Sequence, residues 1–326
     1  MKILVTGGSG FIGKRLVKKL SDAGENVVVF GREDDIDRPD NVPLMTGNIT
    51  DKIALRHAFS GVDIVYHLAA SVDEEDTDME RVNVKGTENV VELCKERKVK
   101  HLVYMSSSGV LGETKVPAKE NLPYNPQTRY EKTKAEAEKI IKHSGVTYTI
   151  VRAPIIIGPN AVWAKIFEAA KRGYPIIGTG KNKLHLAYVD DVVNLLFLVR
   201  NHTKAKDQVF HVAAKDVMTY EDVYRTICQE LKVSMTQKKV PIKAALAMSH
   251  IHNVKSIIKG EPTPLHLRKS SIERLVRNRV LSIQKAKDTL GFQPHYTTPS
   301  AIHETVKYLQ ISRLGYNDYD LANIGK

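Results

Sequence analysis

Lys2-Ile3-Leu4-Val5-Thr6-Gly7-Gly8-Ser9-Gly10-Phe11-Ile12-Gly13 joins a short apolar run to a glycine cluster, and residues 14–20 continue with the apolar spacing of a helix. In this context, between a strand and a helix, backbone N–H groups at the helix N-terminus hold the phosphates of a dinucleotide. Gly7 would permit the tight turn, Gly10 would let the backbone approach the pyrophosphate, and Gly13 would let the helix lie close to the sheet. The stretch therefore predicts a dinucleotide-binding unit.

Strand-like runs rich in apolar and β-branched residues alternate with helix-like segments through the first half of the chain. These runs cover residues 2–6, 26–30, 64–68, 101–106 and 148–152. Such alternation predicts an α/β fold, a doubly wound parallel sheet of the Rossmann type with right-handed crossovers. Residues 209–213 are expected to form one more strand, and Thr219 is expected to cap a helix that ends near Leu231.

Length and a change of rhythm divide the chain into two parts. The 326 residues are enough for two domains, and the regular alternation is lost after residue 155. We expect residues 1–155 to form a dinucleotide-binding domain and residues 156–326 to form mainly a smaller α/β domain that binds substrate. Residues 186–213 are the candidate for a return to the first domain.

Composition is that of a globular protein from a reducing compartment. Hydrophobic residues make up 42% and charged residues 26% of the chain, and no long apolar stretch is present. Neither a transmembrane helix nor a secretion signal is predicted, so the expected location is the cytoplasm. Cys94 and Cys228 are the only cysteines and lie far apart. His250 and His252 have no recognisable third ligand, so no metal site is expected.

Positive charge is concentrated in the later part of the chain. Residues 201–326 carry 20 Lys and Arg against 11 Asp and Glu, and so supply most of the net charge of +12. This favours anionic partners such as nucleotides, phosphorylated substrates or a lipid surface. No nucleic-acid-binding motif accompanies the charge, so nucleic acid is not an expected partner.

Two further segments have alternative interpretations. Residues 242–258 place Ile242, Ala245, Leu246 and Ile251 near one helical face, which predicts an amphipathic helix. Such a helix either packs on the core, covers an apolar substrate or makes peripheral contact with a membrane. The acid-rich residues 73–80 either shape a pocket entrance or form a solvated face.

Three motifs follow the glycine cluster. They are His67-Leu68-Ala69-Ala70, Asn83-Val84-Lys85-Gly86-Thr87-Glu88-Asn89 and Tyr130-x-x-x-Lys134. Together they resemble the extended short-chain dehydrogenase/reductase family, the NAD-dependent epimerase/dehydratase group, over nearly the whole chain. The resemblance implies a homodimer, a small-molecule substrate and a set of cofactor neighbours. Besides the three glycines, these are Phe11, Ile12, Arg32, Asn48, Ile49, Leu68, Ala69, Ala70, Asn83, Tyr130, Lys134 and Pro154.

The expected cofactor is NADP in preference to NAD. An acidic residue at the end of the second strand would accept the ribose hydroxyls of NAD, but this chain has Phe30-Gly31-Arg32, and Arg32 suits a 2′-phosphate. Glu33, one residue later, weakens that preference. Gly47-Asn48-Ile49 resembles the adenine contact of the family with Asn48 in place of an aspartate, and an amide can still hydrogen-bond the adenine amino group.

Tyr130 and Lys134 are four residues apart, so a helix would place both side chains on one face. A phenol with a pKa of about 10 is a poor base at neutral pH, and a neighbouring ammonium would lower that pKa. Lys134 would also hold the nicotinamide ribose, while a hydroxyl from the preceding strand orients the substrate oxygen. Resemblance to the family's Ser-Ser-x-x-Val-Tyr-Gly pattern assigns this hydroxyl to Ser107, with Ser106 and Ser108 on the same turn.

The substrate is expected to be fairly apolar. In the nucleotide-sugar epimerases of the family an asparagine and an arginine contact the diphosphate, and Ile155 and Leu184 stand at these positions here. A diphosphate without charge-assisted donors would bind poorly. With Leu111 replacing a usual tyrosine, the chain is more similar to the branch of 3β-hydroxysteroid dehydrogenases and dihydroflavonol reductases. This resemblance implies NAD(P)-dependent hydride transfer at a secondary alcohol or ketone by a Ser-Tyr-Lys triad.

Two other functions stay open. One is an NAD-dependent nucleotide-sugar epimerase, which regenerates its nicotinamide in every cycle. The other is a non-catalytic NADP-sensing protein of the same fold, which the intact Ser107, Tyr130 and Lys134 disfavour. Dehydration is not expected, because Ser108 and Gly109 follow Ser107 where dehydratases carry a glutamate.

Overall fold

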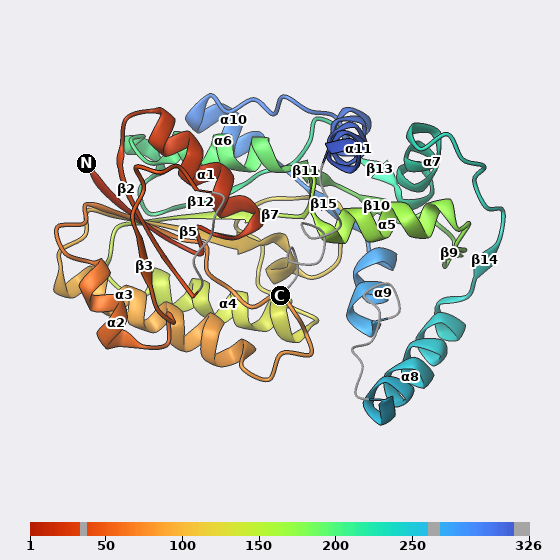
Figure 1. Cartoon of the computed structure of the whole chain (residues 1–326), viewed down its shortest axis with the longest axis horizontal. Coiled ribbons are helices and arrows are strands. Elements are labelled where there is room, and N and C mark those ends of the chain that lie inside the picture. The colour runs from red at the N-terminus through yellow and green to blue at the C-terminus, as the bar shows by residue number, and fades with distance from the viewer. Residues whose placement is uncertain (33–37, 260–267, 316–326) are drawn as a thin grey trace.

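A seven-stranded parallel sheet forms the main layer of the protein. The structure is a computed structural model that describes residues 1–32, 38–259 and 268–315. The strand order is β12-β7-β5-β4-β1-β2-β3, and neighbouring strands run parallel (Figure 1). The strands are β1 (Lys2–Thr6), β2 (Asn26–Gly31), β3 (Leu44–Thr46), β4 (Ile64–His67), β5 (His101–Ser107), β7 (Tyr148–Ala153) and β12 (Gln208–His211). The predicted Rossmann-type sheet is confirmed.

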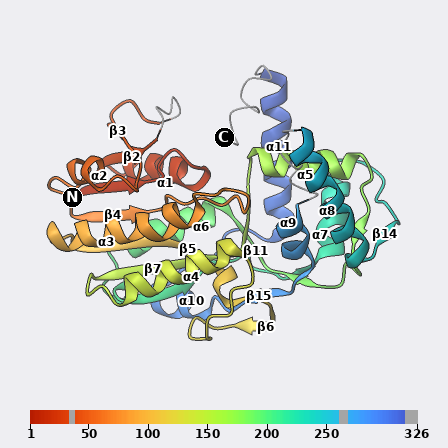
Figure 2. The ribbon, with the colours of Figure 1, turned by 90° about the horizontal axis from the view of Figure 1, so that it is seen from below.

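Helices cover both faces of this sheet (Figures 1 and 2). One face carries α1 (Phe11–Asp22), α6 (Val189–Val199) and α10 (Gln284–Leu290), and the other carries α2 (Lys52–Ala58), α3 (Gly86–Glu96) and α4 (Arg129–Lys142). Leu16, Val17 and Leu20 of α1 are buried, because their spacing puts them on the side of the helix that faces the sheet. Each face of the sheet thus has its own buried cluster.

β6 and most of the elements that follow β7 lie outside the main sheet, and many of them pack around another core. A second sheet has the order β13-β10-β15-β6, and two short pairs join β8 to β11 and β9 to β14. The strands are β6 (Thr114–Ala118), β8 (Ile155–Ile157), β9 (Ile176–Ile177), β10 (Lys183–Leu184), β11 (Leu186–Tyr188), β13 (Met218–Thr219), β14 (Lys239–Val240) and β15 (Arg279–Leu281). The helices are α5 (Ala161–Lys171), α7 (Tyr220–Glu230), α8 (Ile242–Lys259), α9 (Lys269–Val276) and α11 (Thr298–Gly315). The boundary between a cofactor domain and a substrate domain stays a prediction.

Element ends differ slightly from those expected. The strand expected at residues 64–68 ends at His67, and the one expected at 209–213 is Gln208–His211. The sequence does not predict β3, whose three residues lie at the edge of the sheet and pair only with β2. The expected helix after Thr219 is present as α7, and the Thr219 side chain accepts a hydrogen bond from the backbone N–H of Asp222.

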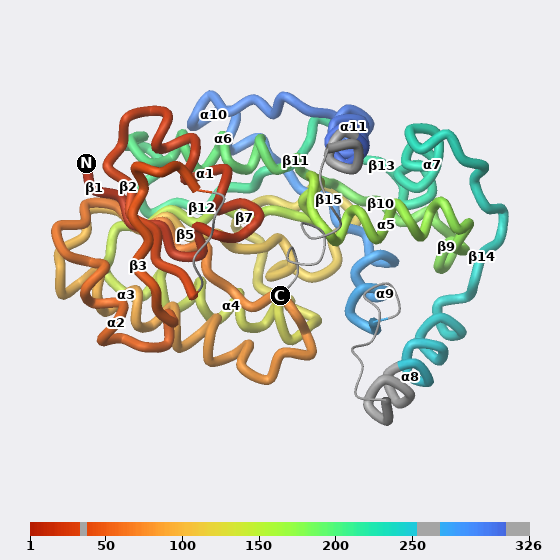
Figure 3. Tube along the Cα trace, in the orientation of Figure 1, coloured from red at the N-terminus to blue at the C-terminus, as the bar shows by residue number. Residues whose placement is uncertain are grey.

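The helix expected at residues 242–258 is α8, but the expected apolar face is wrong in detail. Ala245 and Ser249 are buried, whereas Ile242 and Ile251 are 39% and 54% exposed. α8 packs on α9, and short side chains allow two helices to approach closely. Figure 3 shows α8 at the outer end of this part of the molecule. Among the described residues, no helix is long and apolar enough to cross a membrane.

Candidate active site

The glycine loop lies against the strand end that carries Ala69. Gly7 has a φ of +71°, and a Cβ added to it would lie 2.6 Å from the backbone nitrogen of Ala69. A Cβ at Gly13 would lie 2.1 Å from the carbonyl oxygen of Gly7. Neither position has room for a side chain, which matches the tight turn and the close packing of helix on sheet that the sequence predicts.

The N-terminus of α1 fits a diphosphate. Gly10 is the N-cap, no side chain caps the helix, and its first turn has no acidic residue. The first-turn N–H groups, including those of Phe11 and Ile12, have no acceptors within the helix, and the helix dipole favours an anion there. A Cβ at Gly10 would meet only the carbonyl oxygen of Gly7, at 3.3 Å, so this side of the loop is open. Together these features make a cradle that fits the pyrophosphate of a dinucleotide.

Arg32 and Asn48 lie after the second and third strands. Arg32 follows β2 and is exposed, and Glu33 lies outside the described residues. The side-chain oxygen of Asn48 accepts hydrogen bonds from both the backbone N–H and the hydroxyl of Thr50, at 3.0 and 2.9 Å. Because this carbonyl oxygen is already used twice, the amide N–H₂ is the group left for an adenine. It can donate to a ring nitrogen, but it cannot accept from the amino group that the sequence suggests as its partner. Ile49 is buried and packs against Gly86 at the start of α3.

The end of β4 is held by a buried polar chain. His67 lies between the hydroxyls of Thr6 and Thr87, at 2.8 and 3.0 Å, and burial lowers the pKa of its imidazole to about 3. Leu68, Ala69 and Ala70 follow β4 and are half-buried. His67 is therefore a neutral structural residue that fixes the backbone leading to them.

Asn83 connects the segment after β4 to the helix that carries Tyr130. Its side chain accepts from the N–H of Ser71 at 2.7 Å, and donates to the carbonyl of Ser71 and the hydroxyl of Thr133, both at 2.9 Å. The residue is buried within a short π-helical turn, Arg81–Lys85, before α3. Both amide protons and one lone pair of the amide oxygen are used within the described structure, so Asn83 positions the elements around the cofactor region.

Tyr130 and Lys134 lie one turn apart on α4, which packs against β5. The ammonium of Lys134 is buried, donates to the carbonyl of Met105 on β5 at 2.7 Å and lies 4.2 Å from the ring centre of Tyr104. Burial lowers the pKa of Lys134 to about 7, although Glu138 raises it.

The environment of the Tyr130 phenol differs from the expected one. Burial raises the pKa of Tyr130 to about 12; Arg274 acts in the opposite direction, and Glu131 and Glu74 raise it further. The expected lowering of this pKa by Lys134 is therefore wrong for the described structure. The reason is that the Lys134 ammonium is directed to the Met105 carbonyl.

The three adjacent serines have different surroundings. Ser106 is buried and donates to Glu138 at 2.6 Å, and Ser108 is buried in the following 3₁₀ turn, Ser108–Leu111. Ser107 is half-buried at the end of β5, and its hydroxyl oxygen accepts from the N–H of Gly109 at 3.1 Å. Among the described residues its O–H proton has no acceptor, so it can be donated to a ligand. Pro154 follows the neighbouring strand β7 and is half-buried.

A buried ionic network that the sequence did not predict supports this part of the site. The guanidinium of Arg152 on β7 donates two hydrogen bonds to the carboxylate of Glu138 on α4, at 2.8 and 2.6 Å. Glu138 also accepts from the hydroxyl of Tyr124 at 2.9 Å. Although burial raises the pKa of Glu138, its bonds with Arg152 and Ser106 bring that pKa below the ordinary value. The i, i+4 relation of Lys134 and Glu138 was the signal available in the sequence.

The acid-rich segment 73–80 is bound to the start of α4. The carboxylate of Glu74 accepts from the backbone N–H of Tyr130 at 3.3 Å, where a negative charge also suits the helix dipole. Arg129 donates to the carbonyl oxygens of Asp76 and Thr77 at 2.6 and 3.0 Å, and Asp73 pairs with Arg268 at 2.6 Å. The segment is therefore held beside Tyr130.

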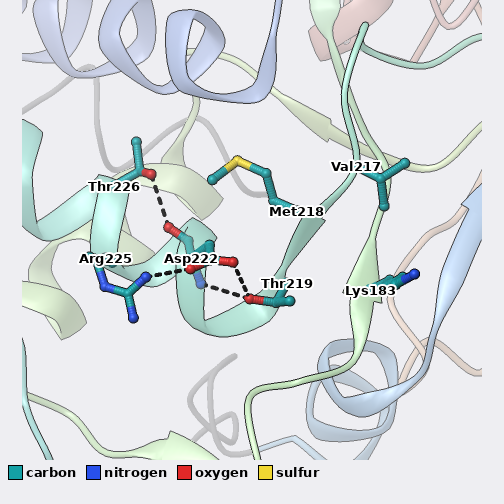
Figure 4. A pocket seen from close by; sticks show the side chains of 7 residues that line it. All are labelled: Lys183, Val217, Met218, Thr219, Asp222, Arg225 and Thr226. Atoms are coloured by element: carbon teal, nitrogen blue, oxygen red, sulfur yellow. Dashed lines mark hydrogen bonds and ion pairs between the residues drawn. The ribbon is translucent and has the colours of Figure 1, made fainter.

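Ile155 and Leu184, which stand where the epimerases carry their diphosphate contacts, differ in burial. Leu184 is buried in the core around β10, so its side chain faces protein, and Ile155 begins β8 and is half-buried. No group of acidic, histidine and cysteine side chains suited to a metal ion occurs in the described ranges. A cavity of about 360 Å³ between β10, β13 and α7 contains none of the predicted site residues (Figure 4). There the carboxylate of Asp222 accepts hydrogen bonds from Thr219, which is the N-cap of α7, and from Arg225, one turn along the same helix.

The chain is similar to proteins of one known family. A family model described as the NAD dependent epimerase/dehydratase family matches residues 3–213. A 3-beta-hydroxysteroid dehydrogenase from Mycolicibacterium neoaurum is 27% identical over 339 residues, covering 94% of this chain and 91% of that protein. A UDP-glucose 4-epimerase from Vibrio cholerae is 27% identical over 324 residues, covering 94% of each chain.

Solved structures share the fold. The crystal structure of a Thermus thermophilus UDP-glucose 4-epimerase in complex with NAD has a TM-score of 0.76 and 23% identity, over 95% of this chain and 99% of that one. The family model spans more than half of the sequence and includes the glycine loop, Ser107, Tyr130 and Lys134. The chain therefore belongs to the NAD dependent epimerase/dehydratase family.

Proposed function

We propose that the protein transfers a hydride between NAD(P) and a secondary alcohol or ketone of a fairly apolar substrate, with Ser107, Tyr130 and Lys134 as the catalytic residues. The observation that carries this proposal is the buried Lys134 ammonium, fixed on the Met105 carbonyl one helical turn from Tyr130. Ser107 ends the strand that contains this carbonyl. A proton-transferring phenol, a cation and a free hydroxyl thus come from two adjoining elements.

In this proposal Tyr130 moves the proton. With a pKa of about 12 the phenol is protonated at neutral pH, which suits donation to a ketone oxygen in the reductive direction. The hydroxyl of Ser107 would hold the same oxygen, because its O–H has no acceptor in the part of the chain that the structure describes. Lys134 would hold the ribose hydroxyls beside the nicotinamide. A bound nicotinamide supplies the hydride acceptor or donor.

NADP is the proposed nucleotide. The cradle around Gly7, Gly10 and Gly13 fits the pyrophosphate of either form, and Arg32 is exposed at the strand end where the adenine ribose would lie. The Thermus thermophilus relative was solved with NAD. The proposed preference therefore depends on Arg32 alone.

The proposed substrate region lies mainly in residues 156–326, with 186–213 returning to the cofactor part as α6 and β12. A diphosphate is disfavoured because the aliphatic Leu184 and Ile155 offer it no donor, and an apolar substrate is supported by the relative named 3-beta-hydroxysteroid dehydrogenase. The second candidate is nucleotide-sugar epimerisation, which the equally similar UDP-glucose 4-epimerase favours. Homodimer formation and contact of residues 242–258 with a membrane stay predictions from the sequence.

Replacement of the proposed proton donor tests the function. Tyr130→Phe is expected to lower kcat/KM for NADP-linked turnover of hydroxysteroids and other apolar secondary alcohols by about 100-fold or more, because one acid/base group contributes this much. NADP affinity should change little. Tyr148→Phe is the matched control, because Tyr148 begins β7 and lies at the end of that strand away from Pro154. This variant should keep full activity. A fully active Tyr130→Phe enzyme would refute the role of Tyr130.

A further inference from the structure

The ammonium of Lys134 lies against an aromatic ring as well as a carbonyl oxygen. Its Nζ atom is 4.2 Å from the ring centre of Tyr104 on β5, and it donates to the carbonyl of Met105, the next residue of that strand, at 2.7 Å. Lys134 is 2% and Tyr104 is 1% exposed, so little water reaches either group. An ammonium has three donors, and the Met105 carbonyl is its one hydrogen-bond acceptor among the described residues.

No carboxylate in the described part of the chain pairs directly with Lys134. Glu138, one turn further along α4, raises the pKa of Lys134, but its carboxylate is bonded to the guanidinium of Arg152 at 2.6 and 2.8 Å. The opposite charges of this pair largely cancel each other at the ammonium. A buried charge without its own counter-ion costs free energy, and the ring of Tyr104 is the group in contact with it that offsets part of this cost.

The other neighbours of the ammonium are neutral. His67 on β4 flanks the ring of Tyr104, with the two ring centres 5.4 Å apart, and burial lowers the pKa of its imidazole to about 3. The phenol of Tyr130 has a pKa of about 12, so it is uncharged at neutral pH. The charged side chains of α3 and of the turn Arg81–Lys85 lie at the surface. These neighbours therefore do not replace the ring as a stabilising group.

We propose that Tyr104 is a positioning residue, whose ring face favours the charged form of Lys134 and holds its ammonium on the Met105 carbonyl. The face of an aromatic ring is negative and attracts a cation, most strongly where water is excluded. The two remaining N–H donors of the ammonium are then available for the ribose hydroxyls of a bound nucleotide. This inference deepens the proposed function and rests on it, because the role of Lys134 toward the ribose belongs to that function.

The ring of Tyr104 can be tested separately from its hydroxyl. The hydroxyl is buried and has no hydrogen-bond partner among the described residues, so Tyr104→Phe keeps the ring and removes a group without a partner. Replacement of Tyr104 by 4-cyanophenylalanine keeps the shape of the ring but withdraws electrons from its face, and Tyr104→Leu removes the ring. Phe59→Leu is the matched control, because Phe59 is a buried ring of the same apolar cluster at the end of α2.

Titration of Lys134 by NMR tests the proposal without nucleotide or turnover. The lysines are labelled with carbon-13 at the ε-carbon, and the signal of Lys134 is identified by its absence from Lys134→Met. Tyr104→Leu should lower the midpoint of this titration by about one pH unit, because a desolvated cation–π contact is worth about that much. 4-Cyanophenylalanine should lower it by about half a unit, since it weakens the contact without removing it. Tyr104→Phe and Phe59→Leu should leave the midpoint unchanged.

The affinity for NADP provides a second measurement that depends on pH. Lowering the midpoint from about 7 to about 6 leaves about one tenth of the ammonium at pH 8 and about half of it at pH 6. Relative to wild type at the same pH, Tyr104→Leu should therefore bind NADP about tenfold more weakly at pH 8 and about twofold more weakly at pH 6. A ring with only a packing role would weaken NADP equally at both pH values.

Several results would overturn the proposal. An unchanged midpoint in Tyr104→Leu would do so, and so would an equal decrease in Phe59→Leu. If Tyr104→Leu does not fold, Tyr104→Phe and the 4-cyanophenylalanine protein decide, because both keep the ring, and equal midpoints would remove its role. Failure of the proposed function is distinguishable, because an active Tyr130→Phe enzyme would refute that function without changing how the midpoint depends on Tyr104.

Discussion

Lys134 carries a charge that is buried and held by one hydrogen bond within the proposed site. Its ammonium is almost completely removed from water, and the Met105 carbonyl is its hydrogen-bond acceptor. Burial lowers its pKa in the folded protein to about 7, from 10.5. Between these pH values the unfolded chain binds more protons than the folded one, so the free energy of unfolding should rise with pH in this window.

This pH dependence can be measured by urea unfolding at several pH values from 7 to 10. Relative to Lys134→Met, the wild type should gain stability as pH rises, by at most about 1.4 kcal/mol per pH unit, the limit for one proton. Lys132→Met, at an exposed position of the same helix, should show the slope of the wild type. Parallel curves for the wild type and Lys134→Met would show that the ammonium keeps its charge when buried.

Gly13 and Gly10 are expected to have different roles in the glycine loop, close packing for Gly13 and nucleotide binding for Gly10. An alanine at Gly13 would place a methyl group 2.1 Å from the Gly7 carbonyl oxygen, so Gly13→Ala should lower the free energy of unfolding by about 3 kcal/mol. An alanine at Gly10 has one neighbour at 3.3 Å, so Gly10→Ala should cost less than about 1 kcal/mol. It should nevertheless weaken nucleotide binding by about tenfold or more, because the methyl group points into the cradle. Thermal unfolding and nucleotide titration check the pair, and normal nucleotide binding by Gly10→Ala would place the pyrophosphate elsewhere.

Local spacing explains which site residues the sequence could predict. The glycines of the loop lie at short fixed distances from one another, and so do Tyr130 and Lys134, so the relation within each group follows from a turn or a helix. The partners of Glu131 and Tyr130 on α9 and β15 lie more than 140 residues away, and no spacing rule connects them. The two hydrogen bonds from Thr50 to the side-chain oxygen of Asn48 could not be predicted either, because they depend on the conformation of the folded turn.

α4 is the element that joins the cofactor part to the later part of the chain. Thr128 and Glu131 form a capping box at its start, and the buried carboxylate of Glu131 also pairs with Arg279 of β15. Glu131→Gln should lower the free energy of unfolding by about 3 kcal/mol, because it leaves Arg279 buried without an opposite charge. Glu136→Gln, half-exposed on the same helix and paired with Lys139, should cost less than about 0.5 kcal/mol. Urea unfolding compares the two, and equal losses would show that Arg279 does not depend on Glu131.

Elements differ in how far their sequences predict them. Strands β1, β2, β4, β5 and β7 are buried runs of β-branched and aromatic residues, and their positions were predicted within about one residue. Two- and three-residue strands such as β9, β10 and β14 are defined by their pairing, which composition does not reveal. In α8, Ala245 and Ser249 are buried within residues 242–252, while the larger Ile242 and Ile251 are exposed, so hydrophobicity alone does not select the packed face.

At the scale of the whole molecule, the parallel direction of the strands brings the proposed site residues to one edge of the sheet. The carboxyl ends of parallel strands meet at one edge, so the glycine loop after β1, Ala69 after β4 and Ser107 at the end of β5 come to the same side. Strand order reverses between β1 and β4, and ligands of such sheets bind at that crevice. Relatives of this chain include a dehydrogenase and an epimerase, which use the bound nucleotide in different ways.

Nucleotide exchange distinguishes these two uses. A dehydrogenase must release its reduced or oxidised nucleotide in each turnover, whereas an epimerase regenerates it in place and retains it. Protein denatured directly after purification should therefore release less than one equivalent of NADP, as measured by mass spectrometry, and the native protein should exchange it with added NADPH. The exposed Arg32 at the edge of the cradle and the aliphatic Ile155 and Leu184 are the reasons for this expectation. Stoichiometric, non-exchanging NAD would contradict both the NADP preference and the dehydrogenase function, and would favour an epimerase.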